Sequence, residues 1–350
     1  MIKTLKLSNF TVFKEAELEF SPGLNVIVGE NGTGKSHLLK LAYTILRTEF
    51  EEEYTRNDPE TYFIQDLDKK MYGVFGRRSS SCIRKGAKTS LTIDVTWGNV
   101  GKNIITISKE EDRISLETRR HTYERPRPSV FIPPKEILSI YPGFRAAIKS
   151  RELEFDATYE DLADALDAVP YRDEKLEYVA EIVALLEKTL RAKPIRDSYG
   201  NFYFVPRDTP HEDIRLKRFD GIHAQMAAEG HRKLGMLTYL IKNGSLKKGS
   251  SLFWDEPEAN LNPKLLSILA RVLVDMSNFM QITIATHSLF LLRELEIMQE
   301  MNRLNTARYF GLHLGRYGTI IEQGNDSSSI GDIAALDMSI EQADRYLRLN

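Results

Sequence analysis

The sequence predicts an α/β fold in which short buried strands alternate with amphipathic helices. Three stretches predict it: GLNVIVG (Gly23–Gly29), SLFWD (Ser251–Asp255) and QITIAT (Gln281–Thr286). Each is a run of apolar and β-branched residues with the length of a buried strand. The first and third runs are followed by segments whose apolar residues recur at helical spacing. Each run also ends in a polar or glycine-rich motif.

Composition places the chain among ordinary globular proteins and excludes several classes. The 350 residues are 42% hydrophobic and 28% charged, with a net charge of −2, so nothing global attracts nucleic acid or acidic membranes. Cys82 is the only cysteine. It excludes an internal disulfide and a cysteine zinc site, and we expect an unremarkable strand or loop residue. No stretch has the apolar length of a signal peptide or a membrane span, so we expect a cytoplasmic protein.

The stretch after the first predicted strand carries a phosphate-binding motif. Gly29, Gly34, Lys35 and Ser36 fit G-x-x-x-x-G-K-[ST], between a strand and a helix as the motif requires. Glycines let backbone N–H groups close around phosphate, and the helix N-terminus favours its charge. Lys35 is expected to reach the β- and γ-phosphates and Ser36 to ligate Mg²⁺. The predicted nucleotide-contacting residues of this loop are Gly29, Glu30, Asn31, Gly32, Thr33, Gly34, Lys35, Ser36 and His37.

The long separation of this loop from the second strand predicts inserted material. Residues 49–134 are interpreted as an insert, whose acidic beginning, residues 49–68, is expected to form a mobile surface loop. Residues 71–127 hold 12 basic and 6 acidic residues. SLTIDVTW, NIITIS and RISLETRR alternate in hydrophobicity, which predicts antiparallel strands and hence a basic β-lobe.

A helical insert is predicted for residues 135–224. Residues 140–195 have apolar positions at i, i+3 and i+4, and Asp197–Pro206 indicates a hairpin with Gly200 at its turn. Two helices of this size are too short for a long coiled coil, which needs many sustained heptads. We therefore interpret them as a docking surface.

Charged residues end the second and third predicted strands. A carboxylate at a strand end can hold Mg²⁺, and its neighbour can deprotonate an attacking water. We assign Asp255 to the metal and Glu256 to the general base. His287 ends the next strand, where it could reach a γ-phosphate. Two further strands, 307–315 and 318–324, and a helical tail over residues 326–350 complete the chain.

These motifs together carry a family resemblance. Asp-Glu-Pro at 255–257, Glu-Ala-Asn-Leu-Asn-Pro at 258–263 and Ala-Thr-His-Ser at 285–288 resemble the ABC-type ATPases of the SMC, RecF and OLD-like group, as do the first 36 residues. The resemblance implies a P-loop NTPase fold of ABC-ATPase type, with its core in residues 1–48 and 225–325. It also implies ATP and Mg²⁺ as cofactors, and a head-to-head homodimer that sandwiches two ATP.

The sequence departs from the family pattern at the signature motif, which is Leu-Ser-Gly-Gly-Gln. Ala227–His231 stands at that place, and Gly230 alone matches. Gly230 can still expose a helix N-terminus to the partner's phosphate. Arg232 or Lys233 would then supply the missing charge; the alternative is that both are solvated helix residues.

Two further departures concern neighbouring motifs. Asn262 replaces the aspartate of the family's D-loop. The glutamine of the Q-loop is not evident, since Pro133 and Pro134 follow the strand that should carry it. With Glu256 and His287 both present, these departures predict slow hydrolysis, as in a switch.

Two functions remain open at this point. One is an ATP-gated regulator of a separate effector protein, as in bacterial anti-phage systems. The other is a RecF-like DNA-binding or repair ATPase that uses the basic lobe, with Arg77–Lys88 (RRSSSCIRKGAK) as the best nucleic-acid contact. The alternative reading of that lobe is an ordinary solvated face. A GTPase is disfavoured because no Asn-Lys-x-Asp motif is present, and a transporter because the signature is degenerate.

Overall fold

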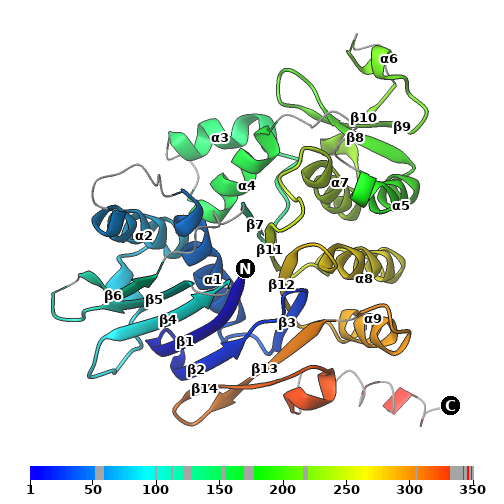
Figure 1. The fold of residues 1–350 in the computed structure, drawn as a ribbon. Helices are drawn as coiled ribbons and strands as arrows, with labels where there is room; N and C mark the ends of the chain where they lie inside the picture. The colour runs from blue at the N-terminus through cyan, green and yellow to red at the C-terminus, as the bar shows by residue number, and fades with distance from the viewer. Residues whose placement is uncertain are drawn as a thin grey trace.

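The computed structural model shows an α/β molecule built around two sheets and a smaller third one (Figure 1). It describes residues 1–51, 59–98, 101–111, 113–120, 128–150, 154–168, 177–215, 220–304 and 306–331, together with 342, 345, 346 and 348. No helix in the described part of the chain has the length and apolarity needed to cross a membrane.

The core sheet has six strands in the order β14-β13-β3-β12-β11-β7, of which all but β14 are parallel. This order confirms the α/β prediction, and the three predicted strands are neighbours within it. The bounds are β3 Leu24–Gly29, β7 Ser129–Ile132, β11 Ser251–Asp255, β12 Gln281–Thr286, β13 Ala307–Gly315 and β14 Gly318–Gly324.

The lobe sheet is antiparallel, in the order β2-β1-β4-β5-β6. Its strands are β1 Ile2–Phe10, β2 Phe13–Glu19, β4 Leu91–Trp97, β5 Gly101–Ile107 and β6 Ile114–Arg120. The three predicted lobe strands are confirmed. The chain's first two strands also join this sheet, because β1 pairs with β4 across most of its length.

Helices cover both faces of the core sheet (Figure 1). The helix α1 packs between the core sheet and the lobe, while α8 and α9 cover the opposite face. The helices are α1 Lys35–Glu51, α2 Pro59–Phe75, α3 Tyr141–Lys149, α4 Ala157–Asp167, α5 Ala180–Leu190, α6 His211–Arg215, α7 Glu229–Lys242, α8 Pro263–Ser277 and α9 Leu289–Glu300.

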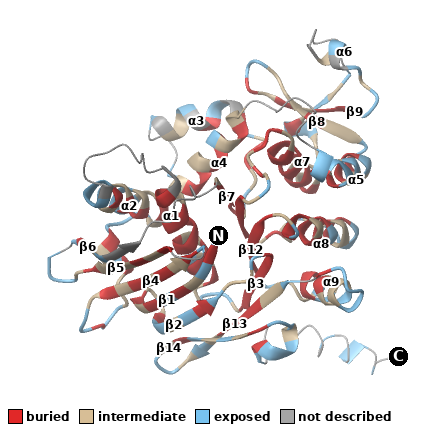
Figure 2. Ribbon diagram, in the orientation of Figure 1, coloured by how far each residue is buried: buried red, intermediate tan, exposed pale blue. Residues whose placement is uncertain are grey.

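Period-two alternation along the core strands, which are buried (Figure 2), divides the interior into two hydrophobic cores. In β11, Leu252 and Trp254 join the core shared with α7 and α8, whereas Phe253 joins the one shared with α1 and the lobe. Successive side chains of a strand point to opposite faces, so one apolar run serves both cores. Burial on both faces explains why these strands read as continuous apolar runs.

A third, three-stranded sheet lies beside α5 and α7. It consists of β8 Ala192–Arg196, β9 Phe202–Pro206 and β10 Ile222–His223. The predicted hairpin turn is confirmed, with Gly200 at φ +88°, a conformation that favours glycine. The predicted helix, however, ends before residue 195. Arg191 adopts a left-handed cap at φ 55°, and the chain turns there into β8.

The expectation of a loop over residues 49–68 is wrong for the part that the structure describes. The helix α1 continues to Glu51, and α2 begins at Pro59. Phe63, Leu67 and Met71 are buried one helical turn apart, so a stripe at i, i+4 and i+8 packs despite the acidic surroundings. Residues 52–58, most of the predicted tail and the basic stretch 121–127 lie outside the described residues. Within the tail, Ser327–Ile330 forms one 3₁₀ turn.

Two amide side chains, one buried and one more exposed, join the lobe to the core sheet. The Gln281 amide group accepts from the backbone N–H of Ile2 at 2.9 Å and donates to the carbonyls of Ile2 and Ser21, each at 2.8 Å. Gln323 forms a more exposed link, accepting from the N–H of Glu19 and donating to the carbonyl of Glu17. Each amide takes the place of a strand neighbour. The lobe that carries the first two strands is thereby fixed against the strands that carry the motifs.

We predict that Gln281→Met lowers the free energy of unfolding by about 2 kcal/mol, because it leaves buried backbone groups of Ile2 without partners. Gln323→Met is the matched control, and its exposed bonds should cost less than about 1 kcal/mol. Urea unfolding followed by circular dichroism measures both. Equal effects of the two substitutions would contradict the role given to Gln281.

Candidate functional site

The predicted motifs meet at one edge of the core sheet. Strands β3, β12 and β11 are adjacent and parallel, with Val28 opposite Thr286 and Ala285 opposite Asp255. Their carboxyl ends therefore lie side by side, which brings together loops that are more than 200 residues apart in the chain. In open α/β sheets, this edge is where ligands bind.

The phosphate loop is closed around its own lysine. Lys35 Nζ donates to the carbonyl oxygens of Gly29 and Glu30, each at 2.8 Å. The loop needs glycine at Gly34, whose φ is +96° and where a Cβ would lie 2.6 Å from Val12. Burial lowers the pKa of Lys35, and the Asp255 carboxylate partly opposes this shift. The lysine thus faces the second motif across the loop.

Asp255 is buried beside Ser36 at the carboxyl end of β11. Its side chain is only 3% exposed, burial raises its pKa, and a hydrogen bond from Ser36 counteracts that shift. Oδ1 of Asp255 has no hydrogen-bond partner among the described residues. A buried carboxylate oxygen without a partner, next to a hydroxyl, fits the ligand set that Mg²⁺ prefers. The residues assigned to the metal are therefore adjacent and chemically suited to it.

Glu256 follows in a backbone conformation that side chains rarely adopt. Its φ is +49°, and its N–H donates to the carbonyl of Ala285 at 2.9 Å. Left-handed backbone at a non-glycine residue costs free energy and is concentrated at functional sites. Its Oε1 lies 3.6 Å from Nδ1 of His287. The predicted base and the predicted histidine are thus neighbours.

A second glutamate, which the sequence analysis did not single out, holds the histidine. Oε1 of Glu258 accepts from the Thr286 hydroxyl at 2.7 Å and from the backbone N–H of His287 at 3.1 Å. It also lies 3.4 Å from His287 Nδ1. The sequence signal was its place two residues after Glu256. A carboxylate there fixes the loop after β12 and orients the imidazole ring.

The helix α7 lies against the loop that follows β11. Gly230 is buried, and a Cβ on it would lie 3.1 Å from the Asn260 carbonyl. One interpretation of the sequence made Lys233 a solvated helix residue, and the structure contradicts it. It is 2% exposed, and its Nζ donates to the carbonyls of Glu256 and Ala259, each at 3.0 Å.

The structure places Arg232 in an ion pair within its own chain. Its Nε donates to Glu136 and its Nη1 to the carbonyl of Ala227, each at 2.5 Å. The Glu136 side chain is only 4% exposed. Glu136 stands after β7, where a Q-loop was sought, and it was missed because its partner lies 96 residues away. This pair links the end of β7 to α7.

Two other predicted residues have local structural roles here. Asn262 is exposed and caps α8, accepting from the N–H of Leu265 at 3.0 Å. His37 lies edge-on to Phe10 and Phe75, with ring centroids 6.4 and 6.1 Å away. Its imidazole therefore packs against the lobe strand β1 and the helix α2. Asn31 and Gly32 are exposed at the tip of the loop.

Comparison with known proteins matches both halves of this site separately. Residues 1–125, which contain the phosphate loop, match a family model described as an AAA ATPase domain. Residues 206–293, which contain Asp255, Glu256 and His287, match one described as an AAA domain, putative AbiEii toxin, Type IV TA system. A crystal structure titled "SmcHead bound to the C-winged helix domain of ScpA" has the same fold. It covers 93% of this chain and 98% of its own, with a TM-score of 0.54 and 16% identity.

The chain therefore has the fold of an SMC head, and it is similar in sequence to RecF proteins. The DNA replication and repair protein RecF of Staphylococcus haemolyticus is 25% identical over 274 residues, which are 75% of this chain and 68% of that protein. The RecF of Streptococcus gordonii is 30% identical over 80 residues, 23% of this chain and 22% of that protein. The predicted fold is thereby confirmed, and so is the resemblance to RecF and SMC proteins.

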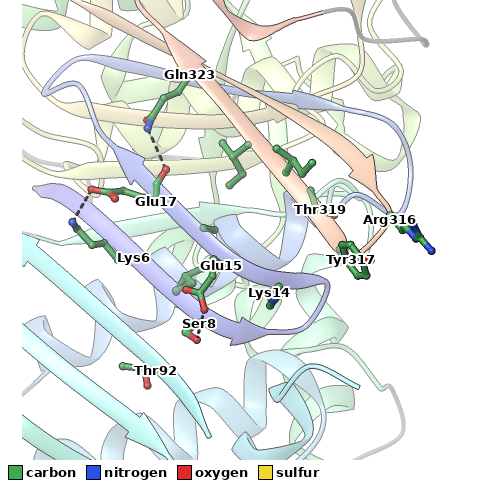
Figure 3. A pocket seen from close by; sticks show the side chains of 15 residues that line it. Lys6, Ser8, Lys14, Glu15, Glu17, Thr92, Arg316, Tyr317, Thr319 and Gln323 are labelled. Carbon is green, nitrogen blue, oxygen red and sulfur yellow. Dashed lines mark hydrogen bonds and ion pairs between the residues drawn. The ribbon is translucent and has the colours of Figure 1, made fainter. Parts of the chain in front are cut away.

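The structure also has a groove of about 800 Å³ between β2 and β14 (Figure 3). None of the motif residues lines it. Lys6 pairs with Glu17 at 2.8 Å, and Ser8 donates to Glu15 at 2.9 Å, so the walls are of mixed charge. The groove is therefore separate from the nucleotide motifs.

We predict that Asp255→Asn stabilises the nucleotide-free head at pH 7.5. Burial raises the folded-state pKa of Asp255 above its unfolded value. Between these two pKa values the unfolded chain binds fewer protons than the folded chain, so stability falls as pH rises through them. The asparagine removes this cost. Its gain should shrink as pH falls towards about 4, the ordinary carboxyl pKa, because wild-type Asp255 is then also neutral.

Thermal unfolding checks this, measured first in chelator without nucleotide and then in Mg-ATP without chelator. The variant should gain less from Mg-ATP than wild type. Asp161→Asn, which breaks the ion pair of Asp161 with Lys70, is the control and should lower Tm. A lower Tm for Asp255→Asn in chelator at pH 7.5 would contradict the prediction.

Proposed function

We propose that this head is a slow ATP-hydrolysing switch, which dimerises head-to-head around ATP and Mg²⁺ and regulates a separate effector protein. One observation carries the proposal: a phosphate loop, an acidic pair whose first member is buried, and a histidine converge at one sheet edge. Both matched family models are ATPase domains, which supports ATP as the nucleotide.

The phosphate loop would bind the triphosphate. Lys35 would exchange its bonds to the Gly29 and Glu30 carbonyls for bonds to phosphate oxygens, which a charged acceptor favours. Ser36 and Asp255 would hold Mg²⁺, which would neutralise charge on the phosphates. Oδ1 of Asp255 is buried and has no hydrogen-bond partner in the described part of the chain, which supports this assignment.

Glu256 is proposed as the group that orients and deprotonates the attacking water. Its backbone is fixed by Ala285, and its carboxylate lies beside His287. Glu258 holds the histidine in turn. His287 would then contact the γ-phosphate without moving away from the base. General-base catalysis of this kind contributes about 10²- to 10⁴-fold.

The N-terminus of α7 is proposed to face the nucleotide of a second copy. Ala228 caps this helix without a side-chain hydrogen bond, so the first N–H groups have no partner from that side chain. Met226, just before it, is 82% exposed, as expected of a surface that another chain would cover. Gly230 would contribute through its backbone. Arg232 would have to leave Glu136 to reach a partner's phosphate, and Asn262 would have to leave its cap, which supports slow turnover.

An effector protein is proposed as the target because of the helical insert and its hairpin. Tyr199, at the hairpin turn, is 77% exposed, and Ile222 of β10 is also exposed. The family model over residues 206–293 names a putative AbiEii toxin of a toxin–antitoxin system. That description supports a role in bacterial defence, where an ATP-gated head would hold or release a toxic partner.

The second candidate is a RecF-like ATPase that binds DNA. The similarity to two RecF proteins favours it, as do exposed cations in the lobe segment 77–88. Part of this segment is already engaged, since Arg84 donates to the carbonyl of Tyr317 at 2.6 Å. Clustered cations without interleaved aromatic rings are a weaker nucleic-acid surface than the basic charge alone indicates.

We predict that Glu256→Gln retains ATP binding and lowers kcat at least about 100-fold, because the amide cannot accept the water's proton. The variant should form a dimer with Mg-ATP that wild type forms only transiently. Phosphate release and light scattering after size exclusion measure the two effects. Glu300→Gln, an exposed change at the end of α9, is the control for altered charge. Wild-type turnover of tens per second without a partner would overturn the slow switch.

We also predict that tagged Glu256→Gln, expressed in its native host with flanking genes, retains a stoichiometric protein and little nucleic acid. Trapping the closed state should hold whatever binds that state. Mass spectrometry and the ratio of absorbance at 260 and 280 nm read the outcome. Co-purifying nucleic acid that is lost on adding salt, or on substituting Arg77, Arg78, Arg84 and Lys85, would establish the RecF-like alternative instead.

A further inference from the structure

A lysine lies buried beneath the proposed catalytic loop. Lys233, on the second turn of α7, is 2% exposed, and the residues that follow it on the helix, Leu234 to Leu237, are buried too. Lysine is almost never fully buried unless it is paired, because removing its ammonium group from water is costly. Burial lowers its pKa to about 8, against the opposing effect of nearby glutamates. Such a residue calls for an explanation from its contacts.

The contacts of Lys233 are directed to one short loop. Its Nζ donates to the backbone carbonyls of Glu256 and Ala259, each at 3.0 Å, and lies 5.9 Å from the Trp254 ring. Trp254 is the last apolar residue of β11 before the acidic pair. The ammonium group therefore binds both ends of the 256–259 turn and lies near β11, the strand that precedes the turn.

That turn is the part of the site under conformational strain. Glu256 has its φ at +49°, a strained conformation that its surroundings must hold in place. If those contacts were lost, the backbone would relax and the side chain would point in another direction. Lys233 holds the carbonyl of this same residue. Gly230, one turn earlier on α7, packs within 3.1 Å (measured from an ideal Cβ) of the Asn260 carbonyl. The helix thus touches the loop at two successive turns, and a shift of α7 would be felt at Glu256.

We propose that Lys233 is a positioning residue that couples the place of α7 to the geometry of the general base. The proposal rests on the role of Glu256 proposed above. Because the N-terminus of the same helix is the part proposed to meet the nucleotide of a second copy, one site would set the hydrolytic competence of the other. Lys233 would touch neither nucleotide; it would act through the backbone of Glu256.

The test compares Lys233→Met with wild type in the full chain. Methionine has a similar length and suits the buried place, but it leaves the two carbonyls without their donor. We expect kcat to fall about 10- to 100-fold, because small misplacements of a catalytic group have effects of this size. The KM for ATP, the affinity for ATP and the ATP-dependent dimer of the Glu256→Gln background should change less than about twofold, since Lys233 is not placed among the phosphate ligands.

A double-mutant cycle separates positioning from general damage. If Lys233 acts through the Glu256 carboxylate, Lys233→Met should lower the residual rate of Glu256→Gln no further, because the group that it positions is already inactive. Lys242→Met is the matched control: it is a lysine of the same helix, paired with Glu187 at 2.8 Å and remote from the loop. It should leave kcat unchanged. Lys233→Gln retains an N–H donor, and its kcat should lie between those of wild type and Lys233→Met.

Each outcome decides the proposal. Wild-type kcat in both Lys233 variants overturns it, and so does a fall in kcat that matches the loss of ATP affinity or multiplies with Glu256→Gln. If Lys233→Met does not fold, a Lys233→Gln variant with normal Tm and normal kcat also overturns it. Full hydrolysis by Glu256→Gln would instead refute the proposed function, whatever Lys233 does.

Discussion

The parallel pairing of β3, β12 and β11 is the constraint on which the site depends. Parallel strands in register end at the same edge, and here that edge receives a phosphate loop, an acidic pair and a histidine from three distant parts of the chain. No motif alone defines a site. Asp255 is proposed as a metal ligand because Ser36 lies against it, and Glu256 is proposed as the base because His287 follows the neighbouring strand.

Burying charged groups at this edge costs free energy. Lys35, Lys233 and Asp255 are all buried, and burial works against the charged form of each. The two lysines are stabilised by backbone carbonyls that accept their hydrogen bonds, whereas a hydrogen bond from Ser36 counteracts the effect of burial on Asp255. Main-chain groups therefore hold the two buried lysines in place. Substituting a charged side chain here would also disturb the loops that it holds.

Local sequence patterns predicted the features that depend on local structure. The strand, loop and helix around Lys35 follow from spacing alone, and alternation predicted β4, β5 and β6. Glu136 and Lys233 could not be assigned because their roles arise from partners tens of residues away. The joining of β1 to β4 is likewise a non-local pairing, of Leu5 with Val95. In α2, the buried stripe from Phe63 was readable, but the acidic composition around it concealed the helix.

The exposed link made by Gln323 has a consequence beyond joining two sheets. The edge strands β2 and β14 lie beside each other, and the Gln323 amide occupies backbone groups of Glu17 and Glu19. An unpaired strand edge is a template on which another chain can add a strand and begin to aggregate. By satisfying part of the β2 edge with a side chain that cannot propagate a ladder, the head closes that template while leaving the two sheets distinct.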